Sequence, residues 1–472
     1  MATHLNTHAV VIGAGPGGYV AAIRLAQHGI DTICVDEKFL GGVCLNVGCI
    51  PSKALITASK RYEQALKHNA EMGVNATGVS VDMGQMQRWK NTVVNKLTTG
   101  VGGLFKGNGV KNVTGRARIT SPSQVHVSGP DGETVIDAKA IIVATGSRPI
   151  QIPGFEVDQV NVLDSTGALD LDHIPKRLVV IGGGYIGLEL GSAYGRLGSK
   201  VTVVELADQL LPGFPKDLVR PVQRRMSSHG SEFLLGHKAL GWSADTDGSL
   251  RVTVQDASGS PATVVADKIL LTVGRRPNSE GLGLEELGVT MDRGFVPVDN
   301  QMRTNVPGIF AIGDLVGNPM LAHKASAEAG VVADVIAGKN TVFDARCIPA
   351  VVFTDPEVAT VGLSETQAKS EGFSVKTGKY PFAGLGRALT TGETDGFVRV
   401  IADGDSTEIL GVEIVGPEAS DLIAEAGLGI EMGALVDDIG LTIHAHPTLA
   451  EAVMEAAEAA LGHCVHMVNR RR

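Results

Sequence analysis

Apolar and polar positions follow the same order twice along the chain. A short apolar run, typical of a buried strand, is followed by a helix-like stretch and then by a second strand-like run. The segments are 10–12, 19–27 and 32–35 in the first copy, and 179–181, 188–197 and 201–204 in the second. Strand, helix and strand in this order are typical of a parallel sheet covered by helices. The pattern therefore predicts an α/β fold that contains the same unit twice.

Glycines occupy the junction between the first strand and the helix of each copy. Both junctions read Gly-x-Gly-x-x-Gly. The two sets are Gly13, Gly15 and Gly18, and Gly182, Gly184 and Gly187. The first glycine allows a tight turn, the second lets the backbone approach a pyrophosphate, and the third lets the helix pack closely on the strand. The phosphates then lie at a helix N-terminus, where free N–H groups favour anions.

An acidic residue ends the second strand-like run of each copy. Asp36 and Glu205 each lie 23 residues after the first glycine of their motif. A carboxylate at this place accepts hydrogen bonds from ribose hydroxyls. One glycine motif alone is weak support, because two structural turns are the simpler explanation. Two copies with an acid at the same offset favour two Rossmann-like dinucleotide-binding domains.

Further landmarks divide the chain into regions. Gly-Ser-Arg-Pro at 146–149 and Gly-Arg-Arg-Pro at 274–277 each follow an apolar, strand-like run. We expect a helical insertion at 53–106 and a long Ala- and Glu-rich helix at 449–462. The expected domains are 1–150, 151–277, 278–347 and 348–472.

Composition and charge narrow the class of protein. The 472 residues include 60 glycines, yet 43% are hydrophobic, which excludes a flexible low-complexity chain. The glycines are therefore needed locally, at turns or beside a ligand. The net charge of −10 argues against nucleic-acid binding. We find no apolar stretch of about 18 residues that predicts a membrane helix. With no targeting segment before the first apolar run, we expect a cytoplasmic protein.

Two of the five cysteines, Cys44 and Cys49, lie close together in the segment 41–53, G-G-V-C-L-N-V-G-C-I-P-S-K. Zinc ligation is one alternative, but no second Cys or His pair with zinc spacing follows, and we expect no metal. Two unrelated buried thiols are another. Lys53 lies four residues after Cys49, and a nearby cation favours a thiolate. A redox-active disulfide beside a bound cofactor is the interpretation that we favour over these two alternatives.

The segment 41–53 resembles the redox-disulfide signature of the flavin disulfide reductases, and in this form it resembles the dihydrolipoamide dehydrogenases most. Further matches are both glycine motifs, A-T-G-S-R-P at 144–149, A-I-G-D at 311–314, M-L-A-H-K-A at 320–325 and H-A-H-P-T-L-A-E at 444–451. The resemblance implies an FAD- and NAD-dependent homodimer. Its third region would complete the FAD site, and its C-terminal α+β domain would form the dimer interface.

The resemblance implies an FAD site built around the first glycine motif. Asp36 would bind the adenosine ribose, Lys53 would lie near the flavin N5, and Asp314 would bind the ribityl chain. The remaining residues expected at FAD are Glu37, Gly115, Thr145, Gly146, Ser147, Met320, Ala322 and His323. Backbone at 320–323 would reach the flavin at a helix N-terminus, which stabilises negative charge.

The resemblance implies an NAD site at the second glycine motif, together with Gly274. Glu189 would lie near the nicotinamide and pair with Lys53. Glu205 favours NAD over NADP, because a carboxylate accepts from a 2′-hydroxyl and repels a 2′-phosphate. Arg220, Arg224 and Arg225 are near in sequence but fall outside the strand end. Tyr185 inside the motif departs from the dihydrolipoamide dehydrogenase pattern, and its ring could cover the flavin until nicotinamide enters.

Two C-terminal histidines, His444 and His446, need separate interpretations. They are too few ligands for a metal. The segment 448–451 also predicts a capping box, in which Glu451 needs no catalytic role. The resemblance implies that His446, supplied by the partner subunit, is the acid–base group and that Glu451 orients it; we interpret His444 as structural.

The resemblance as a whole implies oxidation of dihydrolipoamide through a Cys44–Cys49 disulfide. The expected partners are the lipoyl domains of 2-oxo-acid dehydrogenase acyltransferase cores or the carrier protein of glycine cleavage. The alternative is another NAD(P)H-dependent flavin disulfide reductase, such as a glutathione-type enzyme. The chain lacks a C-terminal cysteine pair, which disfavours thioredoxin and mercuric reductases.

Overall fold

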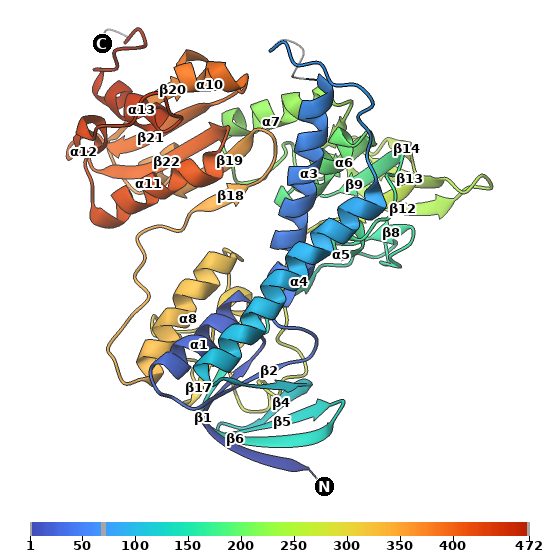
Figure 1. Ribbon diagram of the computed structural model, residues 1–472, viewed down its shortest axis with the longest axis vertical. Helices are drawn as coiled ribbons and strands as arrows, with labels where there is room; N and C mark the ends of the chain where they lie inside the picture. Colours follow the sequence, from blue (N-terminus) through green and yellow to red (C-terminus); the bar gives the residue numbers. More distant parts are fainter. Residues whose placement is uncertain (1, 68–71, 470–472) are drawn as a thin grey trace. The chain divides into compact units, whose positions relative to one another are not determined.

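The computed structural model describes residues 2–67 and 72–469. The chain forms two compact units. The first consists of Met1–Leu55, Met83–Ile150 and Gly274–Asp344, and the second of Ile56–Asp82, Gln151–Val273 and Ala345–Arg472. Figure 1 follows the chain through both units by colour.

The first unit is built on a seven-stranded sheet in the order β3-β2-β1-β6-β5-β4, with β17 paired to β6. Its parallel strands are β1 (Thr3–Ile12), β2 (Thr32–Asp36), β3 (Lys111–Thr114), β6 (Gly132–Val143) and β17 (Ile309–Ala311). β4 (Arg116–Ser121) and β5 (Gln124–Gly129) extend it as antiparallel strands. The predicted parallel sheet is therefore confirmed.

Alternate residues of β1 enter two different cores, as the two-residue period of a strand requires. Ala9 and Val11 pack with α1 (Pro16–Gln27), α4 (Met83–Asn108) and α8 (Ala322–Ile336). Val10 and Ile12 pack on the opposite face against the segment 282–316. The last four residues of the strand, 9–12, are buried on both faces, which is why they read as a continuous apolar run.

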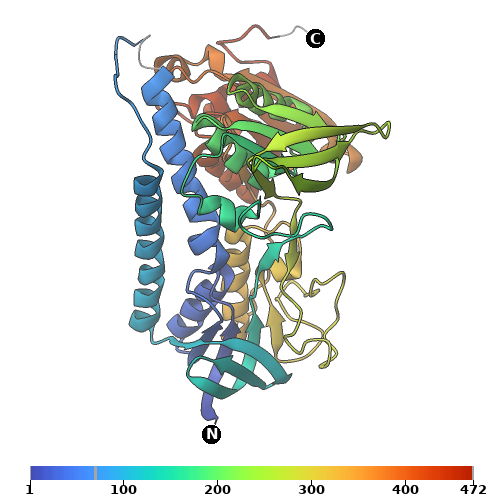
Figure 2. The ribbon, with the colours of Figure 1, turned by 90° about the vertical axis from the view of Figure 1, so that its right-hand side faces the viewer.

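The second unit repeats this plan with a five-stranded parallel sheet in the order β11-β10-β9-β15-β8. The strands are β8 (Val162–Leu163), β9 (Arg177–Ile181), β10 (Lys200–Glu205), β11 (Glu232–Leu235) and β15 (Lys268–Leu271). The helices of this part are α5 (Ser165–Leu169), α6 (Tyr185–Arg196) and α7 (Lys216–Ser228). A separate antiparallel sheet of β12 (Lys238–Ala244), β13 (Leu250–Gln255) and β14 (Pro261–Ala266) packs against it through Leu250, Val252 and Val254. Figure 2 shows these three strands as a separate yellow-green layer.

The C-terminal part of the second unit is α+β. Its antiparallel sheet has the order β18-β19-β22-β21-β20, with bounds Ala350–Val352, Glu357–Gly362, Ile409–Gly416, Phe397–Asp403 and Val375–Pro381. Its helices are α9 (Glu365–Ser370), α10 (Gly386–Thr391), α11 (Ala419–Met432), α12 (Val436–Leu441) and α13 (Glu451–Leu461). A Cβ at Gly378 would lie 2.0 Å from the Ala456 carbonyl oxygen, so α13 packs directly on β20.

Further helices and short strands of the chain carry candidate residues. α2 (Gly42–Val47) and α3 (Cys49–Lys67) carry the two cysteines, and α3 and α4 form the predicted helical insertion. The tetrapeptides noted above form β7 (Ser147–Pro149) and β16 (Arg275–Pro277), which pair with each other in an antiparallel ladder. Among residues 2–67 and 72–469, every helix is too short or too polar to span a lipid bilayer.

Candidate active site

The first glycine motif forms a tight turn between β1 and α1. Gly13 has a φ of +102°, and a Cβ at Gly18 would lie 1.8 Å from the Gly13 carbonyl oxygen. The space beside Gly15 is open: among the described residues outside its own turn and helix, its Cβ would approach the Cα of Gly42, at 4.0 Å. Gly15 is also the N-cap of α1. This open backbone at a helix N-terminus fits the pyrophosphate of a dinucleotide.

The second glycine motif has the same construction between β9 and α6. Gly182 has a φ of +105°, and a Cβ at Gly187 would lie 2.3 Å from the Gly182 carbonyl oxygen. A Cβ at Gly184, the N-cap of α6, would meet none of the described residues within 4 Å apart from its neighbours in the turn and helix. The geometry therefore offers a second cradle for a dinucleotide phosphate.

The acid of each copy is bound to its own glycine turn. Asp36 Oδ2 accepts a hydrogen bond from the Ala14 backbone N–H at 2.7 Å. Glu205 Oε2 accepts one from the Gly183 N–H at 2.6 Å, and its Oε1 accepts one from the Ala207 N–H at 2.8 Å. These backbone contacts could not be read from the motif. Arg224 and Arg225 pair instead with Asp395 and Asp355.

The two cysteines are brought into contact at the junction of α2 and α3. A hydrogen bond to Cys49 is the main reason that the pKa of Cys44 is raised, with burial second, while the charge of Lys53 acts in the opposite direction. Cys44 is half-buried and Cys49 is exposed. Cys49 is the first residue of α3 and Lys53 lies one turn later, and both a helix N-terminus and a cation stabilise a thiolate.

A polar chain surrounds Asp314. Asp314 Oδ2 accepts a hydrogen bond from the Ser147 hydroxyl at 2.5 Å, and Arg275 Nε donates to the same hydroxyl at 2.8 Å. The neighbouring Gly313 N–H donates to Glu328 Oε2 at 2.7 Å. Buried Glu328 also pairs with buried Lys324 at 2.7 Å. Sequence reasoning missed this pair, although opposite charges four residues apart in an apolar helix are a visible signal.

The other residues expected at FAD lie around the same sheet ends. Gly115 N–H donates to the Asp36 carbonyl at 2.9 Å, and the Thr145 hydroxyl donates to the Asn278 carbonyl at 2.7 Å. Gly146 has a φ of +69° and open space at its Cβ position. Met320 precedes α8, whose first residues are Ala322 and His323, so this segment does lie at a helix N-terminus. Glu37 is exposed beside Asp36.

Tyr185 and Glu189 lie on α6 of the second unit. The Tyr185 side chain is 41% exposed at the first turn of the helix. Glu189 is buried, and its Oε1 accepts a hydrogen bond from the Phe353 backbone N–H at 2.9 Å. Gly274 begins the last segment of the first unit. The pairing of Glu189 with Lys53, which belongs to the first unit, stays a prediction.

His446 and Glu451 form a close pair at the start of α13. His446 Nδ1 lies 2.8 Å from Glu451 Oε1, and the histidine side chain is 77% exposed. Burial raises the pKa of Glu451, but the Thr448 N–H and His446 outweigh it, so the pKa is lowered overall. His444 has its ring nitrogens on Glu425 and on the Thr442 carbonyl, and its side chain is buried.

The predicted capping box at 448–451 forms only in part. Glu451 Oε2 accepts from the Thr448 backbone N–H at 2.9 Å, as expected. The Thr448 hydroxyl instead donates to the Ala445 carbonyl at 2.7 Å. The reason is that α13 begins at Glu451 itself, so Thr448 lies too far before the helix to cap it.

Comparisons with known proteins agree with this architecture. Residues 7–329 match the pyridine nucleotide-disulphide oxidoreductase family, and residues 348–457 match the dimerisation domain of that family. The dihydrolipoyl dehydrogenase of Geobacillus stearothermophilus is 52% identical over 99% of this chain and 98% of its own. That of Bacillus subtilis strain 168 is 51% identical over 98% of both chains.

Solved structures give the same relationship. LpdA from Mycobacterium tuberculosis superposes with a TM-score of 0.88 at 28% identity, covering 96% of this chain and 99% of that chain. The HOCl-induced flavoprotein disulfide reductase RclA from Escherichia coli has a TM-score of 0.85 at 26% identity, with coverage of 96% and 99%. The chain therefore belongs to the pyridine nucleotide-disulphide oxidoreductases, among the dihydrolipoyl dehydrogenases that use FAD and NAD.

Proposed function

We propose that the chain oxidises protein-bound dihydrolipoamide to lipoamide and reduces NAD, with Cys44 and Cys49 as the redox pair. The contact between these two thiols at the start of α3 is the observation that carries the proposal. It lies in the unit that also holds the first glycine cradle. The named relatives, at about half identity over the whole chain, support the substrate class.

The residues act in thiol–disulfide exchange. His446 removes a proton from one substrate thiol, and the resulting thiolate attacks Cys44 in the Cys44–Cys49 disulfide. The S–S bond breaks, Cys49 leaves as a thiolate, and a mixed disulfide joins Cys44 to the substrate. The second substrate thiol then displaces Cys44 and closes the lipoamide ring. FAD held by Asp36, Lys53 and Asp314 would supply the two-electron link between the resulting dithiol and NAD.

We propose separate places for the two cofactors within the domains expected from the sequence. In this proposal, residues 1–150 and 278–347 hold FAD through Asp36, Lys53 and Asp314. Residues 151–277 hold NAD through the second glycine motif, Glu189 and Glu205. The open Cβ positions at Gly15 and Gly184 support both assignments.

We propose that residues 348–472 pair two subunits, with His446 serving the cysteines of the partner subunit. The match to the family's dimerisation domain supports a homodimer. Large apolar side chains are exposed in this part of the single chain, namely Leu428, Met432, Leu441 and Ile443. A surface of this kind is typical of a protein–protein interface. Exposure of His446 on the same part of the chain supports its use by a neighbour.

Lipoyl domains of a 2-oxo-acid dehydrogenase core or of the glycine cleavage carrier protein are the partners we propose. They carry the dithiol that the redox pair requires. The cytoplasmic location expected from the sequence belongs to the same proposal.

A glutathione-type reductase is the second candidate, because exposed Tyr185 departs from the dihydrolipoamide dehydrogenase pattern. Parallel assays of lipoamide with NAD(H) and of glutathione with NADP(H) distinguish the two. We expect turnover with the first pair, since Glu205 disfavours a 2′-phosphate. Preference for the second pair would overturn the proposed substrate.

Replacement of either cysteine tests the redox pair. We expect Cys44→Ser and Cys49→Ser to abolish dihydrolipoamide–NAD turnover while bound FAD, measured by its visible absorbance, is retained. Cys347→Ser is the matched control, because this half-buried cysteine belongs to the second unit, whereas Cys44 and Cys49 belong to the first. Normal turnover in Cys44→Ser would contradict the proposal.

A further inference from the structure

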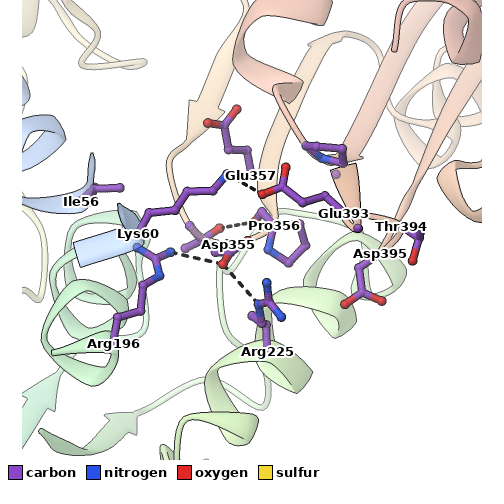
Figure 3. A pocket seen from close by; sticks show the side chains of 14 residues that line it. Ile56, Lys60, Arg196, Arg225, Asp355, Pro356, Glu357, Glu393, Thr394 and Asp395 are labelled. Atoms are coloured by element: carbon purple, nitrogen blue, oxygen red, sulfur yellow. Dashed lines mark hydrogen bonds and ion pairs between the residues drawn. The ribbon is translucent and has the colours of Figure 1, made fainter. Parts of the chain in front are cut away.

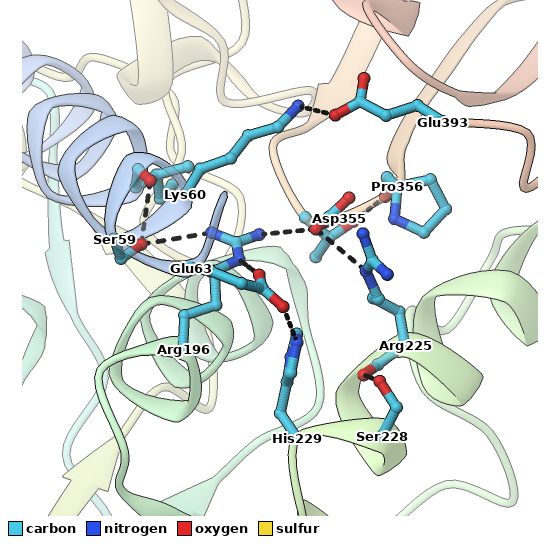
Figure 4. Close-up of polar contacts among 12 residues, drawn as sticks. Ser59, Lys60, Glu63, Arg196, Arg225, Ser228, His229, Asp355, Pro356 and Glu393 are labelled. Carbon is cyan, nitrogen blue, oxygen red and sulfur yellow. Dashed lines mark hydrogen bonds and ion pairs between the residues drawn. The ribbon is translucent and has the colours of Figure 1, made fainter. Parts of the chain in front are cut away.

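A buried charged network fills the space between α3, α6, α7 and the segment 353–357 in the second unit (Figure 4). Its centre is Arg196, the last residue of α6, whose side chain is 1% exposed. Arg196 lies 3.7 Å from Asp355 Oδ2 and 3.5 Å from Glu63 Oε2, and it donates to the Ser59 hydroxyl at 3.3 Å. The guanidinium is thus surrounded by acceptors from α3 and from the segment 353–357.

Each carboxylate of the network also has a second partner. Arg225 Nε donates to Asp355 Oδ2 at 3.2 Å, and Glu63 Oε1 lies 2.5 Å from His229 Nε2. A buried ion pair is weak support for a purely stabilising role, since apolar replacements are often as stable. A second use of such a network is to fix the geometry of the backbone segments that carry it.

The spacing of residues along α6 shows which backbone segment the network fixes. Glu189 and Arg196 are seven residues apart, so they lie two turns apart on one face of the helix. Glu189 accepts from the Phe353 N–H at 2.9 Å, and Arg196 pairs with Asp355. The short segment 353–355 is therefore attached to α6 at both of its ends. The buried Thr354 hydroxyl donates to the Pro356 carbonyl at 2.9 Å and restricts the segment further.

We propose that Arg196 and Asp355 are positioning residues for Glu189. They hold the segment 353–355 against α6, so that the Phe353 N–H donates to Glu189 and fixes the direction of its carboxylate. The inference rests on the proposed place of Glu189 beside the nicotinamide. A small displacement of a positioned group costs up to about 100-fold in rate, so a loosened segment slows the nicotinamide half of the reaction and spares the thiol half.

A cavity of about 130 Å³ adjoins the network (Figure 3). Its lining includes Lys60, Arg196, Arg225, Asp355 and Glu393. Lys60 and Glu393 form an ion pair at 3.0 Å. A cavity with this polar lining has room for water. Water from this cavity can therefore solvate the charged groups left in a conservative variant of Arg196. We expect such a variant to fold.

The test uses Arg196→Lys and Asp355→Asn in the FAD-loaded dimer, with the two half-reactions measured separately. Hydride exchange between NADH and thio-NAD reports the nicotinamide side, and anaerobic reduction by dihydrolipoamide in stopped flow reports the thiol side. We expect the first to slow roughly 10- to 100-fold and the second to stay within about 2-fold. The proposal would be overturned if both half-reactions slowed equally, or if neither slowed.

Amide hydrogen exchange gives a readout that is independent of turnover. We expect faster exchange of the Phe353 amide in both variants, because the hydrogen bond to Glu189 is less protected when the segment 353–355 is released. Unchanged exchange at Phe353 would also contradict the proposal. Arg399→Met is the matched control. Arg399 is a largely buried arginine that bridges Asp217 at 2.6 Å and Glu413 at 3.0 Å, and its loss should change neither half-reaction selectively.

Glu189→Gln separates this inference from the proposed function. If Glu189→Gln leaves hydride exchange unchanged, the proposed place of Glu189 fails, and the positioning role fails with it. If Glu189→Gln slows exchange but the Arg196 and Asp355 variants do not, the positioning role alone fails. In a double variant, Asp355→Asn should add no further loss to Glu189→Gln, because residues that act through one group are non-additive.

Discussion

Asp36 and Glu205 each perform two tasks with one carboxylate. One oxygen accepts from a backbone N–H inside the glycine turn, at 2.7 Å for Asp36 and 2.6 Å for Glu205. The other oxygen of Asp36 accepts from the Lys38 and Phe39 N–H groups, and that of Glu205 from the Ala207 N–H. An ionised carboxylate has about four acceptor sites, so at least one site on each acid remains for a ribose hydroxyl. The acid therefore helps to shape the phosphate turn as well as to select the ribose.

Glu205→Gln separates these two tasks. The amide oxygen can still accept from the Gly183 N–H, while the charge that repels a 2′-phosphate is removed. We expect the preference for NAD over NADP, as a ratio of kcat/KM values, to fall about 10-fold, the effect of losing roughly one unit charge near the surface. Thermal stability should fall by about 1 kcal/mol, because the glutamine N–H2 group cannot accept the hydrogen bond that Glu205 Oε1 takes from the Ala207 N–H. An unchanged ratio would show that other groups select the nucleotide.

His446→Gln tests the acid–base assignment. We expect kcat/KM for dihydrolipoamide to fall by about 10²–10⁴, the usual size of general acid–base catalysis. Glu451→Gln should cost less, because it weakens the orientation of the ring and the contact with the Thr448 N–H but leaves the imidazole in place. His444→Gln is the control: it should lower stability, since His444 is buried on Glu425, with little effect on kcat. Near-normal turnover of His446→Gln would refute the role.

The glycine turns show how an element depends on the absence of a side chain. Gly187 is needed for packing, because a Cβ would lie 2.3 Å from the Gly182 carbonyl oxygen. Gly184 is not needed for packing, because its Cβ position has open space among the described residues outside its own turn and helix. The two glycines of one motif are therefore required for different physical reasons, as the spacing of the motif predicts.

This difference gives a test at the scale of the β9–α6 turn. We expect Gly184→Ala to keep the thermal midpoint of the wild type and to raise the Kd for NAD, since the methyl group occupies ligand space. Gly187→Ala should lower both stability and NAD affinity. Calorimetry together with NAD titration measures the two effects. A lowered midpoint in Gly184→Ala with unchanged affinity would contradict the proposed phosphate site.

The starts of the helices were less well predicted than their existence. α1 begins at Pro16 and α6 at Tyr185, each three residues before the predicted start. The glycines of the motif do not resemble helix formers, yet the third glycine lies inside each helix, where close packing on the strand requires it. Local propensity was outweighed by a tertiary contact.

At the scale of the whole molecule, stability depends on pH through buried carboxylates. Burial raises the pKa of Glu63, but His229, Arg225 and Arg196 outweigh it and lower the pKa to about 2. The folded pKa lies below the ordinary value of 4.5. The contribution is therefore complete above about pH 4.5 and is lost as the pH falls towards 2, and it amounts to about 3 kcal/mol.

Glu63→Gln tests this linkage. We expect the free energy of unfolding to differ from wild type by about 3 kcal/mol or more at pH 7, and the difference to shrink between pH 4.5 and 2. Urea unfolding at several pH values measures it. Glu365→Gln, on an ion pair at the surface, should change the free energy by less than about 1 kcal/mol. A difference independent of pH would contradict the assignment.

Three features are local in the sequence: the repeated pattern, the two acids at a common offset, and the cysteine segment. From them the sequence by itself determined the α/β class, the two dinucleotide-binding folds and the candidate redox pair. Contacts between distant segments were decided only by the tertiary structure. Examples are the pairing of β7 with β16, the hydrogen bond from Phe353 to Glu189, and Arg196 between Glu63 and Asp355. Such contacts join residues far apart in the chain, and no periodicity records which of many polar side chains will be buried together.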